Sequence, residues 1–218
     1  MLALDPLADP FILSVGAAVV RGLPTAARTN LSARSPLTGG LAEGQVGSEL
    51  GRRLAFYWDA VVLLGKVEGG SGVLILDGEG AVSVCSRPDL LALSGGERNA
   101  QLVRDLGPGV GLCSGPAAQA GVRYAQLAAG SDPPSFVGGA GLGRALAQHG
   151  LLGLFVQSPP VPSRLLPALG QALLESPRLK ARSLGGTLEL FDVQGVDSGA
   201  GAPDLGNQDL KRHGCRGC

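Results

Sequence analysis

Lysine and aromatic residues are scarce in this chain of 218 residues, and neither sign of charge is in excess. Lysine occurs only at Lys66, Lys180 and Lys211, aromatic residues make up 4% of the sequence, and 18 basic residues balance 18 acidic ones. Binding to nucleic acid or to an anionic membrane needs a basic excess or a basic patch. The composition supports neither kind of partner, and we expect no nucleic acid and no membrane.

The chain also lacks an apolar run long enough to cross a bilayer. The run from Phe11 to Val20 is too short, and Asp5 and Asp9 stand where a secretory signal carries basic residues. The four cysteines form no framework of the kind found in small disulfide-rich domains. We therefore expect a cytoplasmic location, with Cys85 and Cys113 as buried, inert core thiols.

Glycine is abundant, at 36 residues, and 44% of the chain is hydrophobic, which predicts a packed core with many tight turns. Short apolar runs predict strands at 60–64 and 73–76, and the Asp77-Gly78 pair predicts a tight hairpin into a strand at 81–84. Residues 187–193 alternate apolar and polar side chains, which is typical of a half-buried strand.

Helical spacing of apolar residues predicts helices between these strands. The expected helices are 46–57, one beginning at Pro88, 142–148 and 164–174. Strands interleaved with helices indicate an α+β or α/β fold. The proline-rich segment 158–162 is the best candidate for an internal boundary.

Three glycine-rich stretches could bind phosphate, because a glycine loop before a helix presents unpaired N–H groups. They lie at 35–47, 115–118 and 138–143. Arg28, close in sequence to the first stretch, could clamp a phosphate through two parallel hydrogen bonds. Taken singly, each stretch is more often a plain turn, and Arg28 a solvated surface arginine.

The pair Cys215 and Cys218 has the spacing that lets two thiolates turn toward one metal ion or one edge of an iron–sulfur cluster. A cluster needs four thiolates, so this pair supplies half of the ligands. A zinc site that also uses His213 and a tail without function are the alternatives. His149, at the end of a predicted helix, has a structural role as its simplest interpretation.

Taken in order, these pieces resemble the N-terminal part of the tungsten-containing aldehyde:ferredoxin oxidoreductases. The segments that carry the resemblance are Arg28-Thr29-Asn30, Ser35-Pro36-Leu37-Thr38-Gly39-Gly40, Gln45-Val46-Gly47, Asp59-Ala60-Val61-Val62, Gly65-Lys66, Gly115-Pro116-Ala117, Val122-Arg123-Tyr124-Ala125, residues 136–143 and the terminal cysteine pair. The resemblance covers most of residues 5–156 and rests on the order and spacing of the segments.

The resemblance implies an α+β fold with mixed or antiparallel sheets and interleaved helices. It implies a cofactor platform over residues 1–206 and the start of an iron–sulfur-binding helical domain at 207–218. In the family the platform carries a tungstopterin or molybdopterin-type cofactor with magnesium. A [4Fe-4S] cluster passes electrons from aldehyde oxidation to ferredoxin, and the product is a carboxylic acid.

The resemblance also implies site residues. They are Arg28, Gln45, Gly47, Gly139, Ala140, Leu142 and Gly143 for the pterin cofactor, and Cys215 and Cys218 for the cluster. Two of these depart from the family pattern. Gln45 stands in place of an asparagine and is longer by one methylene, and Gly139 stands in place of an arginine, which removes a phosphate clamp.

These departures leave a second function open: a non-catalytic relative that keeps the platform as a binding or scaffold module. A small zinc-binding protein is a third. The expected partners are ferredoxin and the remaining C-terminal domains of the same enzyme, and a homodimer is left open. The isolated chain should not oxidise aldehyde, because it lacks half of the cluster ligands and any cover over the metal.

Overall fold

The structure, a computed structural model, describes residues 9–23, 26–130, 133–162, 171–172 and 175–177. The chain divides into two compact units, Met1–Arg164 and Leu165–Cys218. In the second unit the Gln171 side chain donates a hydrogen bond to Glu175 at 2.9 Å. The predicted strand 187–193 and the boundary at residue 206 lie outside the described residues, as does most of the predicted helix 164–174.

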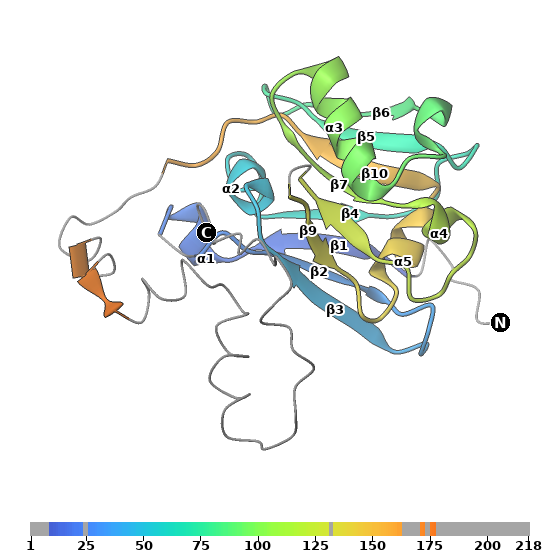
Figure 1. The fold of residues 1–218 in the computed structure, drawn as a ribbon, viewed down its shortest axis with the longest axis horizontal. Helices are drawn as coiled ribbons and strands as arrows, with labels where there is room; N and C mark the ends of the chain where they lie inside the picture. Colours follow the sequence, from blue (N-terminus) through green and yellow to red (C-terminus); the bar gives the residue numbers. More distant parts are fainter. Residues whose placement is uncertain (1–8, 24–25, 131–132, 163–170, 173–174, 178–218) are drawn as a thin grey trace, which may run out of the picture. The chain divides into compact units, whose positions relative to one another are not determined.

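The helices and strands given with bounds below all lie within residues 9–162, in the first unit (Figure 1). The strands are β1 (Phe11–Val15), β2 (Thr29–Arg34), β3 (Leu41–Val46), β4 (Ala60–Leu63), β5 (Gly72–Leu76), β6 (Val82–Ser86), β7 (Val110–Ser114), β8 (Leu127–Ala129), β9 (Ser135–Val137) and β10 (Leu151–Val156). The helices are α1 (Ala17–Val20), α2 (Leu50–Leu54), the 3₁₀ helix η1 (Pro88–Leu90), α3 (Gly95–Leu106), α4 (Pro116–Gln119) and α5 (Leu142–Gln148).

The strands form two sheets. The four-stranded sheet has the order β3-β2-β1-β4 and is antiparallel throughout. The six-stranded sheet has the order β6-β5-β10-β7-β8-β9, and only its β5–β10 pair is parallel. The α+β fold with mixed and antiparallel sheets is therefore confirmed.

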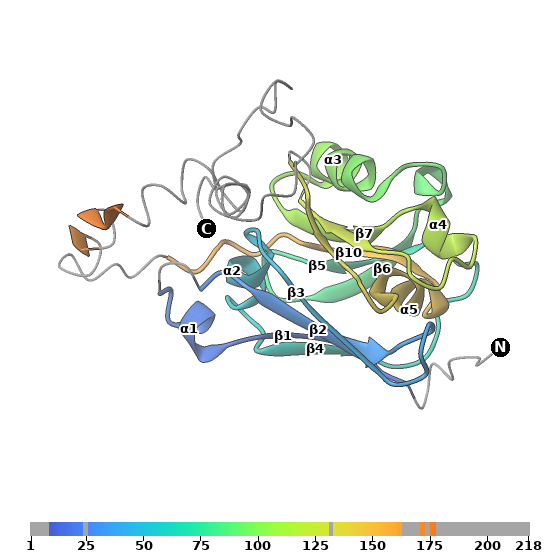
Figure 2. The ribbon, with the colours of Figure 1, turned by 60° about the horizontal axis from the view of Figure 1, so that its bottom comes forward.

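The two sheets face each other and enclose the main core (Figure 2). Alternation of side chains sends Phe11, Leu13 and Leu31 from the four-stranded sheet inward, against Leu112 and Leu154 of the six-stranded sheet. A second cluster lies on the opposite face of the six-stranded sheet, where Phe155 and Val73 pack against Leu102 of α3. The outward face of the four-stranded sheet carries half-buried and exposed side chains, and none of the described helices lies across it.

Three of the four sides of the space between the sheets are closed. Helix α2 closes one end through Leu50 and Leu54, and α5 closes the other through Leu142 and Leu146. On one lateral side β3 contacts β9, so that a Cβ on Gly44 would lie 2.6 Å from Val137. The fourth side lies between β4 and β6, each an outermost strand of its sheet.

Several predicted elements are confirmed. The 73–84 hairpin is the antiparallel β5–β6 pair, in which the Asp77 carboxylate accepts hydrogen bonds from the N–H groups of Glu79 and Ala81. Strand β4 and helix α5 lie where the sequence predicts them. The predicted helix from Pro88 is a single 3₁₀ turn, η1.

The predicted helix over 46–57 is wrong in its first part. Val46 ends β3, and the helix covers only Leu50–Leu54. The reason is local: Ser48 has a φ of 106°, which no helix permits, and Gly47 precedes it.

Helix α3 was not predicted, although its start has a clear signal. The Ser94 hydroxyl accepts from the Glu97 N–H, and the Glu97 carboxylate accepts from the Ser94 N–H, which makes a capping box. Hydrogen bonding of the Glu97 carboxylate to the side chain and to the backbone N–H of Ser94 lowers the pKa of Glu97.

The two single-residue predictions for Cys113 and His149 hold. Cys113 is buried, burial raises the pKa of its thiol to about 12, and it is an inert core residue. The same prediction is wrong for Cys85, whose side chain is only half-buried because it lies on the edge strand β6. His149 is buried at the end of α5, and its Nδ1 lies 2.7 Å from the Gly65 carbonyl oxygen, which is a structural role.

No helix within the described ranges is both long enough and apolar enough to cross a membrane.

Arg98 on α3 is fully buried and ties η1 to the six-stranded sheet. Its guanidinium donates to the carbonyl oxygens of Leu90 at 2.9 Å, Leu91 at 2.8 Å and Ser114 at 2.6 Å. Burial lowers its pKa, yet a guanidinium begins so far above neutrality that it stays charged. Removing the guanidinium would leave these three carbonyl oxygens without a hydrogen-bond donor and without water.

We expect Arg98→Met to lower the free energy of unfolding by about 3 kcal/mol, since three buried carbonyl groups would lose a charged donor. Urea denaturation measures this change. The matched control is Arg104→Met on the exposed side of the same helix, for which the expected change is below about 0.5 kcal/mol. Equal losses for the two variants would show that the buried network contributes nothing.

Candidate functional site

Arg28 and Gly47 lie opposite each other at one end of the β2–β3 pair. Thr29 is the register partner of Val46, so the residues just outside them, Arg28 and Gly47, face each other. A Cβ on Gly47 would lie 3.7 Å from Nη1 of Arg28 and 4.0 Å from the Ser135 hydroxyl. The exposed Arg28 guanidinium therefore extends over Gly47 beside the start of β9, and glycine leaves it room.

Gln45 lies on the outward face of the four-stranded sheet, directly across from Asn30. Asn30 donates from Nδ2 to the Ser32 hydroxyl at 3.4 Å, and Ser14 is its register partner on the other side. Among the described residues, the buried Oδ1 of Asn30 accepts no hydrogen bond. The face next to Gln45 is thus a strip of short polar side chains with one unsatisfied acceptor.

The first and third glycine-rich stretches are brought together by Ser35. Its buried hydroxyl donates to the Ala140 carbonyl oxygen at 2.7 Å and accepts from the N–H groups of Leu37 and Thr38 at 3.2 and 3.1 Å. Gly141 has a φ of 87°, and a Cβ there would lie 2.0 Å from the Arg123 carbonyl oxygen. Only glycine can occupy that position.

Leu142 and Gly143 are buried in the packing of α5. Leu142 is part of the main core, and the Gly143 N–H donates to the Ala125 carbonyl oxygen at 2.9 Å. A Cβ on Gly143 would lie 2.4 Å from the Gln126 carbonyl oxygen, so glycine is required for this close approach. The structure gives both residues a packing role, and a contact between either residue and a cofactor stays a prediction.

Gly139 differs from the neighbouring glycines because it is exposed and has space around it. A Cβ built on it meets no heavy atom within 4 Å. Its position thus accepts a larger side chain without a clash.

Four of the predicted residues, Arg28, Gly47, Gly139 and Ala140, lie along one continuous strip, whereas Leu142 and Gly143 are buried beside it. The segment from Ser135 to Gly141 follows β3, with Ser135 near Gly47, Val137 near Gly44 and Gly141 near Pro36. Arg28 and Gly47 lie at one end of this strip, and Gly139 and Ala140 lie toward the other. We call it the platform strip.

Cys215 and Cys218 lie outside the described residues, as does His213. Among the residues that the structure does describe, no three histidine, cysteine, aspartate or glutamate side chains gather into a metal site. The cluster ligands and the zinc alternative stay untested predictions.

A comparison with models of known protein families identifies the family of the chain. Residues 2–158 match the model of the aldehyde ferredoxin oxidoreductase N-terminal domain. The chain belongs to this family. The resemblance seen in the sequence is thereby confirmed, and the family's enzymes are oxidoreductases.

A solved structure shares the fold of this aldehyde ferredoxin oxidoreductase domain. It is titled the active site complex BamBC of benzoyl coenzyme A reductase in complex with 1,5-dienoyl-CoA, and it matches with a TM-score of 0.67 at 20% sequence identity. The match covers 78% of this chain and 26% of that chain, so this chain spans about a quarter of its length. No curated protein matches.

Sequence reasoning gave no role to Asn30, Ser35 or Ser48. Asn30 and Ser35 lie within segments that the family resemblance names, but strand pairing is needed to show what their side chains face. Ser48 is the only non-glycine residue with positive φ in the described part of the chain, and it directly follows the Arg28–Gly47 end of the strip. Its hydroxyl accepts from the Leu50 N–H at 3.2 Å.

We expect Ser48→Gly to be more stable than Ser48→Ala by about 1–2 kcal/mol, because both lose the hydroxyl and only glycine relieves the positive φ. Chemical denaturation of the two variants measures the difference. Ala100→Gly in the middle of α3 is the control, because glycine in a helix should lower the free energy of unfolding by about 1 kcal/mol rather than raise it. An alanine variant as stable as the glycine variant would mean that the backbone at residue 48 carries no strain.

Proposed function

We propose that this chain is the cofactor platform of an aldehyde:ferredoxin oxidoreductase-type enzyme, and that the platform strip holds a tungstopterin or molybdopterin cofactor. The complete enzyme would oxidise aldehydes to carboxylic acids and pass electrons through a [4Fe-4S] cluster to ferredoxin. The observation that carries the proposal is the strip itself. Arg28 and Gly47 face each other at one end of it, Gly139 is exposed toward its other end, and Gln45 is exposed on the adjoining outward face of the sheet, in a domain that belongs to this family.

The residues present fit the pterin group at the Arg28 end. A pterin phosphate is an anion, and the exposed Arg28 guanidinium can hold it through two parallel hydrogen bonds. A pterin ring carries N–H donors, and the unsatisfied Oδ1 of Asn30 is an acceptor on the same sheet face. The Gln45 amide oxygen is an oxygen ligand of the type that magnesium accepts.

The bound group would supply two-electron redox chemistry at its metal. The chain's own residues bind and orient it. Ser35 fixes the 138–141 segment against the β2–β3 hairpin, and Gly47 leaves the guanidinium room. Cover that excludes water from the metal would come from other domains of the enzyme.

Ferredoxin and those further domains are the partners we propose. The two thiolates of Cys215 and Cys218 would complete a cluster with two from another part of the enzyme. Dimerisation of the chain and a cytoplasmic location stay predictions.

One observation favours the second function, a non-catalytic scaffold. At Gly139, where the family has an arginine, the strip has no side chain and open space. Of the two arginine positions that the family resemblance names, only Arg28 is then left to hold the anionic phosphates, and the affinity for the cofactor is reduced.

We expect Arg28→Ala in the complete gene product to lower the pterin bound per chain by roughly 10-fold or more at limiting cofactor, since charge-assisted hydrogen bonds of about 1.5–3 kcal/mol would be lost. Pterin released by acid and oxidised to its fluorescent form gives the amount. The exposed Arg104→Ala serves as the control. An unchanged pterin content in Arg28→Ala would remove Arg28 from the site.

Gly139→Arg is the complementary variant, with Gly139→Gln as its uncharged partner. Because the position is open, we expect both to fold, and only the arginine to raise the pterin content. No pterin in the wild type together with its appearance in Gly139→Arg would favour the scaffold function for the natural protein.

A further inference from the structure

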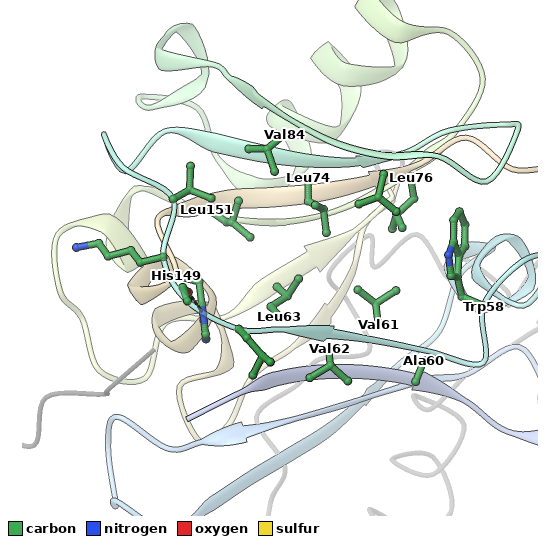
Figure 3. Close-up of a pocket in the computed structure, with 15 residues that line it drawn as sticks. Trp58, Ala60, Val61, Val62, Leu63, Leu74, Leu76, Val84, His149 and Leu151 are labelled. Carbon is green, nitrogen blue, oxygen red and sulfur yellow. Dashed lines mark hydrogen bonds between the residues drawn. The ribbon is translucent and has the colours of Figure 1, made fainter. Parts of the chain in front are cut away.

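Lys66 contributes to two hollows of opposite character. One is the apolar groove between β4 and the β5–β6 pair, of about 440 Å³, which Figure 3 shows with Trp58 and His149 at its two ends. The other is a cleft of about 690 Å³ whose lining also includes Gln119 and Arg144, and we call it the polar cleft. No residue of the platform strip lines the polar cleft, so it is a separate surface from the proposed cofactor site.

The chain after β4 is held against the end of α5, and this contact forms one wall of the polar cleft. The Val67 N–H donates to the His149 carbonyl oxygen at 2.9 Å. A Cβ on Gly150 would lie 2.0 Å from the Val67 carbonyl oxygen, so only glycine permits this approach. Lys66 is therefore held beside the end of the helix that carries Arg144.

Arg144 is half-buried and is fixed from one side only. Its Nη1 donates to the Ala118 carbonyl oxygen, in α4, at 3.0 Å. A guanidinium has five N–H donors, so Arg144 keeps donors for a ligand. Within the described residues, neither Arg144 nor Lys66 forms an ion pair with a carboxylate. The Ala147 carbonyl oxygen at the end of α5 already accepts from the Gly150 N–H at 3.0 Å, and it does not need either cation.

A third cation lies directly behind the lining. The buried Arg98 donates from Nη1 to the side-chain oxygen of Gln119 at 3.3 Å and from Nη2 to the Leu91 carbonyl oxygen at 2.8 Å. Gln119 and Leu91 both line the polar cleft. Every hydrogen-bond acceptor of Arg98 is neutral, and no carboxylate in the described part of the chain pairs with it. The field of a buried charge without a counter-charge is screened little by salt.

The charges at the polar cleft therefore favour an anion. Lys66, Arg144 and Arg98 bring three positive charges, and Glu68 is the one acidic residue among the described residues of the lining. An arginine fork beside a lysine suits the oxygens of a phosphate group, because the fork offers two parallel hydrogen bonds and the lysine a point charge.

The size of the polar cleft suits a small molecule rather than a bare ion. Pockets for small organic ligands have volumes of about 300–1,000 Å³. Leu91, whose side chain is 40% exposed, offers an apolar contact beside the cations. Gly69 and Gly70 lie on the rim with φ values of 82° and 67°, and a Cβ on either meets no heavy atom within 4 Å. The rim is thus open to a ligand.

We propose that the polar cleft binds the phosphate group of a small molecule. Arg144 and Lys66 contact the phosphate oxygens, and Arg98 strengthens the binding as a buried positive charge behind Gln119. This site adds to the platform strip and does not share its residues.

The first test is calorimetric titration of the complete gene product with inorganic pyrophosphate, at an ionic strength fixed with sodium chloride. All variants carry Arg28→Ala, so that the arginine of the platform strip cannot bind the probe. We expect Lys66→Gln to weaken binding by about 10-fold, since a charge-assisted contact is lost. Arg104→Gln on the exposed side of α3 is the matched control and should bind as the parent does. Equal affinities for the two variants, or no binding by the parent, would overturn the proposal.

The second test gives Arg98 the counter-charge that it lacks. In Gln119→Glu a carboxylate stands where the amide oxygen lies 3.3 Å from Nη1 of Arg98. We expect pyrophosphate binding to weaken by about 10-fold or more, because the carboxylate neutralises Arg98 and repels the anion. Gln119→Met, which removes the hydrogen bond and leaves the charge of Arg98, should stay within about 3-fold of the parent. A Gln119→Glu variant that binds as tightly as Gln119→Met would overturn the proposal.

The third test needs no substitution in the polar cleft. Acetylation of Lys66 by an activated ester is followed by peptide mass spectrometry in phosphate-free buffer, with and without pyrophosphate. We expect saturating pyrophosphate to slow the acetylation of Lys66 by about 10-fold. A Lys66 that reacts equally fast in both buffers would contradict the proposal. A Lys66 that does not react in either buffer would show that an acidic protein segment covers the cleft, and would also contradict it.

These results are separate from those for the cofactor. A protein that contains no pterin but binds pyrophosphate through Lys66 would contradict the proposed function and leave this inference intact. A protein that contains pterin and does not bind pyrophosphate would do the reverse.

Discussion

Packing between the inner faces of the two sheets is the interaction on which the other features depend. Phe11, Leu13 and Leu31 are fully buried against the six-stranded sheet, and this contact sets β3 beside β9. The platform strip exists only because of that neighbourhood, since its two halves come from segments about a hundred residues apart in sequence. The same packing leaves the space between β4 and β6 open.

Much of the fold could be predicted from local sequence signals. The Asp77-Gly78 turn and the apolar run after Asp59 gave a hairpin and a strand, and residues 142–148 gave α5. The helix over 46–57 failed because apolar spacing does not reveal that Ser48 takes a positive φ. Helix α3 was missed although Ser94 and Glu97 have the spacing of a capping box.

The candidate site was less accessible to sequence reasoning. The order of segments shared with the family identified Arg28, Gln45 and Gly139 as site residues. It did not show that Asn30 faces Gln45 or that the space at Gly139 is open, because both facts depend on strand pairing and tertiary packing. The structure also separates the named residues into two kinds. Arg28, Gln45 and Gly139 are exposed, whereas Leu142 and Gly143 are held in the core. A cofactor could therefore contact the side chains of Arg28 and Gln45 and occupy the open space at Gly139.

The metal content of the purified complete gene product tests the central claim most directly. Elemental analysis for tungsten, molybdenum, iron and zinc is the measurement. The account predicts tungsten or molybdenum together with about four irons per chain, as one cubane cluster requires. Zinc alone, or no metal, would contradict it and would mean that a platform with Gln45 and Gly139 serves as a scaffold.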